Sequence, residues 1–385
     1  MGMKGVTIGF DGKRAAQNRT GLGNYSRFVI SGLSRFADAG ALKVFTPSAK
    51  KTHCLDGIDK MGGVEMEYPH GLWSGALKQA WRVFGICGDL KRLGVDIYHG
   101  LSNELPIGIE RSGVASVVTI HDLIFLRHPE CYHSFDRKIY DYKFRRACRA
   151  SDRVIAVSEC TKRDITEFYG TDPDKIDVVY QGCDEQFWHV ADETTRQEAR
   201  TKFGLPEHYI LYVGSIERRK NLGLIAEALP LLPKDVKVIA VGRRTAYADE
   251  VERITASNGT RDRMTMLSGV PFRLLPALYQ MSDLFVYPSR YEGFGIPLLE
   301  ALVSRVPVIG CTGSCLEEAG GVGSIYVSPD DAEGLAREIS RVLCDDELRQ
   351  KMIADGVRHA ERFRQKGLTR ELTSVYEKVL GLSQG

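Results

Sequence analysis

Two glutamates with seven residues between them, Glu292 and Glu300, form the segment with the most specific chemistry in this chain. A carboxylate accepts hydrogen bonds from two vicinal hydroxyls at once, which suits a sugar or a ribose. Gly293 and Gly295 let the backbone come close to a ligand, and Pro297 suits the first turn of a helix. The donors that this helix start would offer to phosphate or sugar oxygens are the N–H groups of Phe294, Gly295 and Ile296. Placement near a helix N-terminus would by itself explain Glu300, but neither Glu292 nor the glycines.

Three consecutive cations, Arg218, Arg219 and Lys220, lie between a predicted strand and a predicted helix. The free N–H groups make a helix start positive, so cations are unfavourable there unless an anion binds. We expect Arg219 and Lys220 to neutralise a diphosphate, and Arg218 to point into solvent. A solvated run of charges is the alternative.

A glycine-rich segment opens a helical pattern near the start of the chain. Gly21 and Gly23 would let the backbone approach a phosphate, although a helix start that needs small residues explains them as well. A dinucleotide fingerprint would follow the first strand at once, whereas residues 11–20 intervene here. The second predicted strand, residues 42–45, is followed by residues 46–48, none of which is acidic and could hold a ribose. The pattern therefore argues against a nicotinamide cofactor.

His121 comes directly after the apolar residues 117–120. Side chains at the carboxyl end of a strand lie where α/β proteins bind ligands. His121 is therefore a candidate site residue, with a histidine that satisfies nearby backbone groups as the alternative.

The nine cysteines indicate no metal centre. None forms a Cys-x-x-Cys pair, and Cys311 and Cys315 have no histidine cluster beside them. We expect reduced thiols. No Asp-x-Asp pattern accompanies the motifs above, so we expect neither a catalytic metal nor a cofactor.

Short β-branched runs alternate with longer helical patterns along the whole chain. Strands are expected in the first half at residues 6–10, 42–45, 95–99, 115–120 and 153–157. In the second half they are expected at residues 209–213, 236–241, 264–267, 284–287, 306–309 and 324–327. Helices are expected at residues 21–36, 73–93, 135–150, 159–169, 221–229, 272–281 and 296–303. This alternation predicts an α/β fold of two Rossmann-like, doubly wound domains that face each other across a cleft, with a boundary near residues 181–184.

Size and composition agree with an enzyme of two ordinary domains. The chain has 385 residues, of which 43% are hydrophobic and 26% charged, and its net charge of +2 gives no reason to expect nucleic acid. It has no apolar run of about 18 residues or more and no signal-peptide pattern at its start. We therefore expect a cytoplasmic protein.

Taken together, these motifs resemble glycosyltransferase family 4, the retaining GT-B enzymes, and most of all its mannosyltransferase-B-like branch that builds bacterial surface polysaccharides. The similarity covers nearly the whole chain, and several ordered motifs carry it. They are residues 20–25 (TGLGNY), 118–123 (VTIHDL), 156–159 (AVSE), 181–184 (QGCD), 212–215 (YVGS), 219–221 (RKN) and 292–300 (EGFGIPLLE).

The resemblance implies the following domains and site residues. Residues 1–183 would form the acceptor-side domain, residues 184–366 the nucleotide-sugar-binding domain, and residues 367–385 a helix that crosses back to the first domain. The catalytic residues would be His121, Arg219, Lys220 and Glu292. The donor-binding residues would be Gly21, Gly23, Ser215, Arg243, Val270, Phe294, Gly295, Ile296 and Glu300.

The resemblance also implies a reaction. A hexose would move from a nucleoside diphosphate sugar to an acceptor hydroxyl, with its anomeric configuration retained. Double displacement needs a carboxylate nucleophile, whereas attack on the face of the leaving phosphate needs none, and the family favours the second route. GDP-mannose is the preferred donor, with UDP-hexoses and GDP-fucose as alternatives. The chain departs from some relatives in having Ser215 where they carry Arg, so one cationic ligand of the phosphates is in doubt.

The acceptor side shows a basic stretch beside aromatic residues. Residues 137–153 contain seven Lys or Arg against Asp141 and Asp152, a net charge of +5, and residues 72–84 form an amphipathic stretch with two Trp. Such a face suits an anionic membrane, at the inner face of the plasma membrane, and a saccharide or lipid-linked saccharide as acceptor. A solvated basic helix beside an ordinary core helix is the alternative.

Other functions fit part of these motifs. A nucleoside-diphosphate-binding protein without transfer activity would release no nucleoside diphosphate from any donor. A GT-B synthase would accept a soluble sugar. A nicotinamide oxidoreductase fits least, for the reasons given at the glycine-rich segment.

Overall fold

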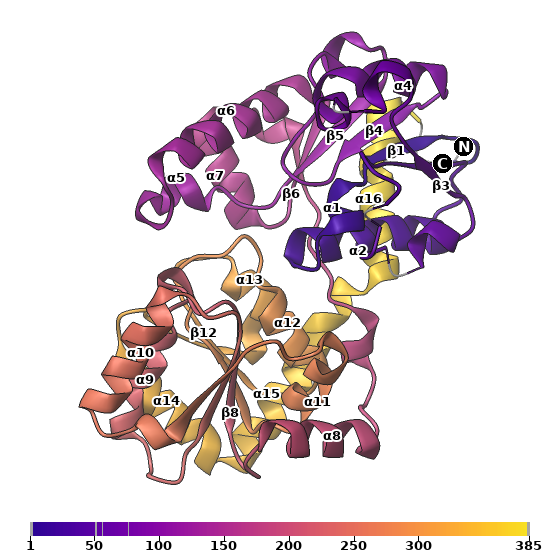
Figure 1. Cartoon of the computed structure of the whole chain (residues 1–385). Coiled ribbons are helices and arrows are strands. Elements are labelled where there is room, and N and C mark those ends of the chain that lie inside the picture. The colour runs from indigo at the N-terminus through magenta and orange to yellow at the C-terminus, as the bar shows by residue number, and fades with distance from the viewer. Residues whose placement is uncertain (1–2, 51, 56, 76, 383–385) are drawn as a thin grey trace. The chain divides into compact units, whose positions relative to one another are not determined.

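The computed structural model describes residues 3–382 except residues 51, 56 and 76. The chain divides into two compact units (Figure 1). Unit 1 is Met1–Gly182 with Phe363–Gly385, and unit 2 is Cys183–Arg362. Each unit is a parallel sheet with helices on both faces, so the predicted α/β class with two Rossmann-like domains is confirmed.

Unit 1 is built on a seven-stranded parallel sheet in the order β3-β2-β1-β4-β5-β6-β7. Its strands are β1 (Ile8–Asp11), β2 (Leu42–Phe45), β3 (Val64–Glu67), β4 (Ile97–Gly100), β5 (Ala115–Ile120), β6 (Arg153–Ala156) and β7 (Ile176–Val178). The order reverses between β1 and β4, and ligands of open α/β sheets bind at the carboxyl ends of the strands at such a switch point.

The helices of unit 1 cover both faces of this sheet. They are α1 (Lys13–Gln17), α2 (Gly21–Phe36), α3 (Lys78–Ala80), α4 (Ile86–Arg92), α5 (Ile124–Arg127), α6 (Ser134–Ala150), α7 (Glu159–Tyr169) and α16 (Gln365–Leu380). Neighbouring residues of one strand enter different cores, as a two-sided sheet requires. Val117 packs with residues of α2 and α16, whereas Val118 packs with residues of α4 and α6.

The last helix, α16, completes the first of these two cores. Leu372, Val375 and Tyr376 are buried there against α2 and the sheet. The Tyr376 hydroxyl lies 2.6 Å from Nδ1 of the buried His99 on β4. Unit 1 is therefore made of two segments that are far apart in the sequence.

Unit 2 has a six-stranded parallel sheet in the order β10-β9-β8-β11-β12-β13, with its switch point between β8 and β11. Its strands are β8 (Ile210–Val213), β9 (Val238–Val241), β10 (Met264–Leu267), β11 (Leu284–Tyr287), β12 (Val308–Cys311) and β13 (Ile325–Val327). In Figure 1, α9, α10 and α14 lie on one side of this sheet and α11, α12 and α15 on the other. Its helices are α8 (Glu193–Phe203), α9 (Leu222–Ala228), α10 (Ala246–Ser257), α11 (Leu275–Gln280), α12 (Ile296–Val303), α13 (Leu316–Gly320), α14 (Ala332–Cys344) and α15 (Asp346–Ala360).

The prediction of one helix over residues 73–93 is wrong in detail. A 3-10 turn at Gly71–Trp73, the short α3, a π-helical turn at Trp81–Gly85 and α4 follow one another there. Ala76, which belongs to the predicted helix, lies outside the described residues. Residues 78–92 are helical without a break, with the π-helical turn in the middle. The Trp73 ring packs so close to Gly85 that a Cβ on this glycine would lie 2.6 Å from it.

Candidate functional site

The motif residues of unit 2 gather at the switch point of its sheet. Arg219 and Lys220 belong to the loop that follows β8, and Glu292 belongs to the loop that follows β11. These strands are neighbours in the sheet although about 70 residues separate the two loops in sequence. The Arg290 N–H donates to the Arg219 carbonyl over 2.8 Å, which joins the loops directly.

Glu292 is the centre of a buried ion-pair cluster in which Oε1 meets four donors. They are Arg219 Nη1 at 3.0 Å, Lys220 Nζ at 2.9 Å, the Tyr287 hydroxyl at 2.8 Å and the Ser289 hydroxyl at 2.8 Å. The side chains of Arg219, Lys220 and Glu292 are only 12–14% exposed. Among the described residues, every hydrogen bond and ion pair of this carboxylate is made through Oε1.

Glu292 is ionised in this cluster. Burial alone would raise the pKa of Glu292, but the charges of Arg219 and Lys220 and the hydrogen bonds from Lys220 and Ser289 hold this pKa well below its usual range. Arg219 also contacts Glu217 at 3.1 Å. An arriving diphosphate would therefore meet two cations that are already balanced by two carboxylates. Arg218 is 73% exposed and pairs with Glu250, as predicted for the cation that faces solvent.

The backbone after Glu292 turns sharply into α12. Gly295 has φ = +113°, a conformation that favours glycine, and the helix begins at Ile296. The Cys315 thiol lies 3.0 Å from the carbonyl oxygens of both Glu292 and Phe294, so it links α13 to this loop. In the part of the chain that the structure describes, nothing accepts a hydrogen bond from the N–H groups of Gly295 and Ile296.

Glu300 lies one turn into α12 and differs from Glu292 in its charge. It is 8% exposed, and its Oε2 accepts a hydrogen bond of 2.9 Å from Tyr279. Burial raises the pKa of Glu300 to about 8, and the charge of Asp184 adds to this effect, although the hydrogen bond from Tyr279 opposes it. Near neutral pH the Glu300 carboxyl is therefore largely protonated in the free protein.

The other predicted donor-binding residues of unit 2 lie at the same edge of its sheet. Ser215 follows β8, the exposed Arg243 follows β9, and the half-buried Val270 follows β10. The first two loops are in contact, because a Cβ on Gly242 would lie 1.8 Å from the Gly214 carbonyl oxygen. Phe294 is buried and anchors the loop before α12.

In unit 1, His121 follows β5 and is a neutral imidazole with both nitrogens bonded. The Gln181 amide donates to Nδ1 over 2.9 Å, and Nε2–H donates to the Leu101 carbonyl over 2.9 Å. Burial lowers the pKa of His121 to about 4, although the bond to Leu101 opposes this effect. The Tyr25 ring packs edge-on against the imidazole at 4.7 Å between centroids. Such a histidine can contact a ligand, but it does not take up protons near pH 7.

Gly21 and Gly23 of α2 differ in how much space surrounds them. A Cβ on Gly23 would lie 1.8 Å from the Asn18 carbonyl oxygen, so the packing of the loop against the helix demands glycine. A Cβ on Gly21 would meet nothing within 4 Å. Packing therefore explains Gly23, whereas no packing contact of the described residues requires a glycine at position 21.

The described residues contain no cluster of histidine, cysteine or acidic side chains that could hold a metal ion. One Asp-x-Asp triplet does occur in the chain, at Asp172, Pro173 and Asp174, in a 3-10 turn of unit 1. The Asp172 carboxylate caps this turn by accepting the Asp174 N–H over 2.9 Å. No described helix is long and apolar enough to cross a membrane.

Sequence reasoning missed several polar partners of these residues. Tyr287 and Ser289 orient Glu292, Tyr279 bonds Glu300, and Gln181 bonds His121. A tyrosine at the end of an apolar strand was visible in the sequence, but the direction of its hydroxyl was not. Gln181 belongs to the motif at residues 181–184, but that motif alone does not indicate what its side chain binds.

Two family models match the chain. The model of the glycosyl transferases group 1 matches residues 194–359, and that of glycosyltransferase family 4 matches residues 32–187.

Individual proteins are similar over most of the chain. O-antigen chain mannosyltransferase B of Escherichia coli is 31% identical over 293 residues, which are 73% of this chain and 74% of that protein. O-antigen chain mannosyltransferase RfbU of Salmonella typhimurium is 26% identical over 344 residues, which are 86% and 89% of the two chains. The crystal structure of Anabaena Alr3699/HepE in complex with UDP covers 97% of this chain and all of that one, with a TM-score of 0.75 and 16% identity. This last likeness concerns the fold alone.

Proposed function

The chain belongs to the glycosyltransferases of group 1 and family 4, and from that premise we propose that it transfers a hexose from a nucleoside diphosphate sugar to a saccharide or lipid-linked saccharide in bacterial surface polysaccharide synthesis. The observation that carries this proposal is the cluster of Arg219, Lys220 and Glu292 at the switch point of unit 2. It puts two cations for a diphosphate and a carboxylate for sugar hydroxyls within one hydrogen-bond network.

Mannose is the preferred hexose. Two relatives that match most of the chain are named mannosyltransferases of O-antigen chains, which supports GDP-mannose. The fold is shared with a protein that was crystallised with UDP, and UDP-hexoses are therefore the second choice of donor.

In the proposed reaction the acceptor hydroxyl attacks the face from which the diphosphate leaves. The bond between the anomeric carbon and the phosphate oxygen breaks as the bond to the acceptor oxygen forms, and the acceptor proton passes to the departing phosphate. The configuration is retained without a covalent enzyme intermediate. Arg219 and Lys220 would stabilise the growing charge, with about 1.5–3 kcal/mol for each charge-assisted hydrogen bond, and the N–H groups at the start of α12 would add to this.

Each carboxyl has its own task in this scheme. Glu292 is fixed through Oε1 and would use Oε2 for hydroxyls of the transferred sugar, while Glu300 would bind the ribose. The amide of Phe294 would line the sugar and diphosphate, and Ser215, Arg243 and Val270 would lie along the rest of the donor. Because cations and helix dipole meet the leaving group, no divalent metal is required. His121 would contact the transferred sugar as a neutral group, and Gly21 and Gly23 would lie beside the diphosphate and acceptor.

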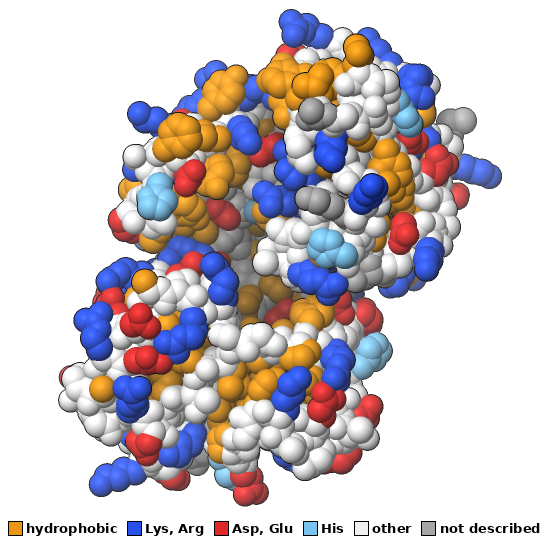
Figure 2. Space-filling view, viewed as in Figure 1, with side chains coloured by type: hydrophobic (Ala, Val, Ile, Leu, Met, Phe, Trp, Pro, Cys, Tyr) orange, Lys and Arg blue, Asp and Glu red, His pale blue; other side chains and the backbone are white. Residues whose placement is uncertain are grey.

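We also propose that unit 1 touches an anionic membrane. Its surface carries the cations of α6 and the exposed hydrophobic side chains of Leu72, Phe84, Phe135 and Tyr142, which are 60–89% exposed. Figure 2 shows hydrophobic groups with Lys and Arg between them on this part of the face. Such a surface binds anionic lipids through charge and apolar insertion. Cosedimentation with anionic but not neutral vesicles is the expected result, and no binding at low salt would argue against it.

The test of the transfer function is a nucleoside-diphosphate release screen. GDP- and UDP-sugars are supplied in excess chelator, first without acceptor and then with soluble and lipid-linked saccharides. We expect release from one donor that increases with a lipid-linked acceptor. Binding of a nucleotide without release from any donor would favour the non-catalytic alternative, and full activity with a free sugar would favour a soluble-sugar synthase.

A further inference from the structure

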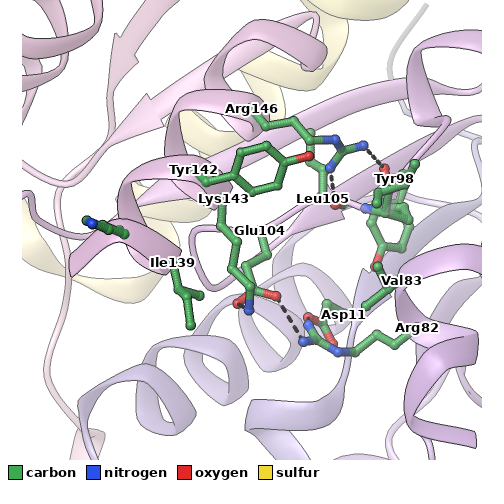
Figure 3. A pocket seen from close by; sticks show the side chains of 13 residues that line it. Asp11, Arg82, Val83, Tyr98, Glu104, Leu105, Ile139, Tyr142, Lys143 and Arg146 are labelled. Atoms are coloured by element: carbon green, nitrogen blue, oxygen red, sulfur yellow. Dashed lines mark hydrogen bonds and ion pairs between the residues drawn. The ribbon is translucent and has the colours of Figure 1, made fainter. Parts of the chain in front are cut away.

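Unit 1 contains a cavity of about 310 Å³ at the switch point of its own sheet. Asp11 ends β1 at the base of this cavity, and Glu104 and Leu105 belong to the loop that follows β4. Ile139 and Lys143 of α6 form an opposite wall (Figure 3). The cavity therefore occupies the position at which open α/β sheets bind ligands, and its size is that of a small-molecule site.

A chain of ion pairs crosses the cavity. Arg82 lies between Asp11 at 2.6 Å and Glu104 at 2.9 Å, and Lys143 reaches Glu104 at 3.0 Å (Figure 3). Asp11 is only 2% exposed. Burial alone would raise the pKa of Glu104, but the charges of Arg82 and Lys143 lower it. The carboxylates are held in place by the cations, and carboxylate oxygens can accept further bonds from hydroxyls.

Tyr98 on β4 contributes a phenolic hydroxyl to the cavity lining. Its side chain is 1% exposed and lines the cavity. None of the described residues hydrogen-bonds the hydroxyl, whose oxygen nevertheless stays in contact with open space. A phenol this deeply buried ordinarily finds a partner, so the free hydroxyl points to a ligand.

The remaining walls are apolar. Val83, Ile107, Ile139 and the ring of Tyr142 lie around the charged groups. A sugar ring presents hydroxyls at its edge and C–H groups on its faces. The cavity offers partners for both in one space of suitable size.

A second hollow, of about 400 Å³, adjoins the first and shares Tyr142 and Arg146 with it. Arg145 and Arg149 line it as well, against a single acidic residue, Glu110. Arginine is the side chain best suited to bind phosphate oxygens in pairs. A ligand with a sugar and a phosphate would fit the two hollows together.

We propose that this cavity of unit 1 binds one sugar residue of the acceptor and that the adjoining arginines bind the phosphate through which that sugar is carried. The assignment of this ligand as the acceptor rests on the proposed transfer function. The binding of a glycosyl phosphate at these residues does not, and it can be measured alone.

The experiment is ligand-observed saturation-transfer NMR on the full chain, with methyl α-mannoside and mannose 1-phosphate as probes. Saturating GDP and UDP are present, so that any nucleotide site in unit 2 is occupied. Three variants are compared with the wild-type chain. Ile139→Trp fills the cavity from α6, Tyr98→Phe deletes only the unused hydroxyl, and Arg149→Gln removes an exposed cation of the second hollow.

We expect both probes to bind the wild-type chain, with mannose 1-phosphate the tighter. Ile139→Trp should weaken both at least ~10-fold, and Tyr98→Phe about fivefold, the loss of one hydrogen bond. Arg149→Gln should reduce only the difference in affinity by which mannose 1-phosphate binds more tightly than methyl α-mannoside. Tyr68→Phe is the matched control, since Tyr68 lies outside the cavity and its hydroxyl has no partner among the described residues either.

Wild-type binding in Ile139→Trp, or no binding of either probe to the wild-type chain, would overturn this assignment. Failure of the transfer function gives a different pattern, namely a chain that binds these sugars but releases no nucleoside diphosphate from any donor.

Discussion

Glu292 contacts other protein groups through only one of its two carboxylate oxygens among the described residues. Four donors surround Oε1 and restrict rotation of the carboxylate. A group fixed before the substrate arrives needs no reorganisation during the reaction. The same bonds hold Lys220 and Arg219 together, so in the proposed reaction one carboxylate would both orient the cations and accept hydroxyls.

Replacing Lys220 or Glu292 by alanine should therefore lower turnover at least ~100-fold each, which corresponds to about 2.7 kcal/mol of barrier. Loss of Lys220 removes a charge from the leaving group, and loss of Glu292 releases both cations. Arg218→Ala is the matched control from the same cation run, because this side chain is exposed and pairs with Glu250. Initial rates at saturating donor measure the effect. Near-wild-type rates in both site variants would exclude this role of the cluster.

The raised pKa of Glu300 predicts how stability depends on pH. A carboxyl that is harder to ionise in the folded state than in the unfolded state stabilises the fold while it is protonated, and the stability is lost as pH rises. This loss should run from the usual pKa near 4.5 up to about 8. Glu300→Gln keeps an acceptor for Tyr279 and cannot ionise, so its melting temperature relative to wild type should increase steadily from pH 5 to pH 8. A difference that is constant over this range would show that Glu300 is ionised in the fold.

Residue types could be predicted at the site because each motif combines chemistry with a position at a strand end. Glu292, Arg219 and Lys220 were found in this way, and the structure brings them into contact. Their close pairing in the free protein was not foreseen, nor was the partner Tyr287. All four residues of β11 are buried, so no alternation of polar and apolar residues marks which way Tyr287 points. The protonation of Glu300 depends on burial and on Asp184, which the sequence does not reveal.

Two glycine variants at the start of α2 distinguish a packing requirement from a requirement for ligand binding. Gly23→Ala would force a Cβ against the Asn18 carbonyl and should destabilise unit 1 by about 1–3 kcal/mol. Gly21→Ala has free space around it and should leave the melting temperature unchanged or slightly higher. If Gly21 lies beside a diphosphate, the Gly21 variant alone should lose activity while it stays folded. Thermal melting and initial rates on both variants measure this.

A destabilised Gly21→Ala variant would show that the fold requires this glycine. A stable and fully active variant would show that neither the fold nor the reaction requires it.

Strands and helices with strong patterns were predictable from the sequence. The predicted strands at residues 42–45, 115–120, 264–267 and 284–287 have the observed bounds, as has the helix at residues 296–303. The strand β3 was missed because it lies at the sheet edge and carries two glutamates, so it does not form an apolar run. The helix at residues 78–92 is shorter than predicted and contains a π-helical turn, and the packing of Trp73 against Gly85 beside it is a tertiary contact that the sequence pattern does not reveal.

At the scale of the whole molecule, the order of the chain makes the two units unequal. Unit 2 is one continuous segment, whereas unit 1 takes its last helix from the end of the chain. A fragment of residues 183–362 should therefore fold and melt cooperatively by itself. A fragment of residues 1–182 lacks Leu372, Val375 and Tyr376 from its core, a loss on the order of 5 kcal/mol, which is comparable with the total stability of a domain.

Circular dichroism melts of both fragments, with residues 363–385 added back as a peptide to the first, measure this difference. A fragment of residues 1–182 that melts cooperatively without the peptide would show that α16 is not needed for the fold of unit 1.

The complete transfer reaction can be followed in a single assay. The wild-type chain is incubated with the donor found in the release screen and a lipid-linked saccharide, in excess chelator, and the product is followed by proton NMR at the anomeric position. We expect a new glycosidic bond with the anomeric configuration of the donor, formed at the same rate with and without chelator. An inverted product, or transfer that stops in chelator and returns only with added metal, would contradict the proposed reaction.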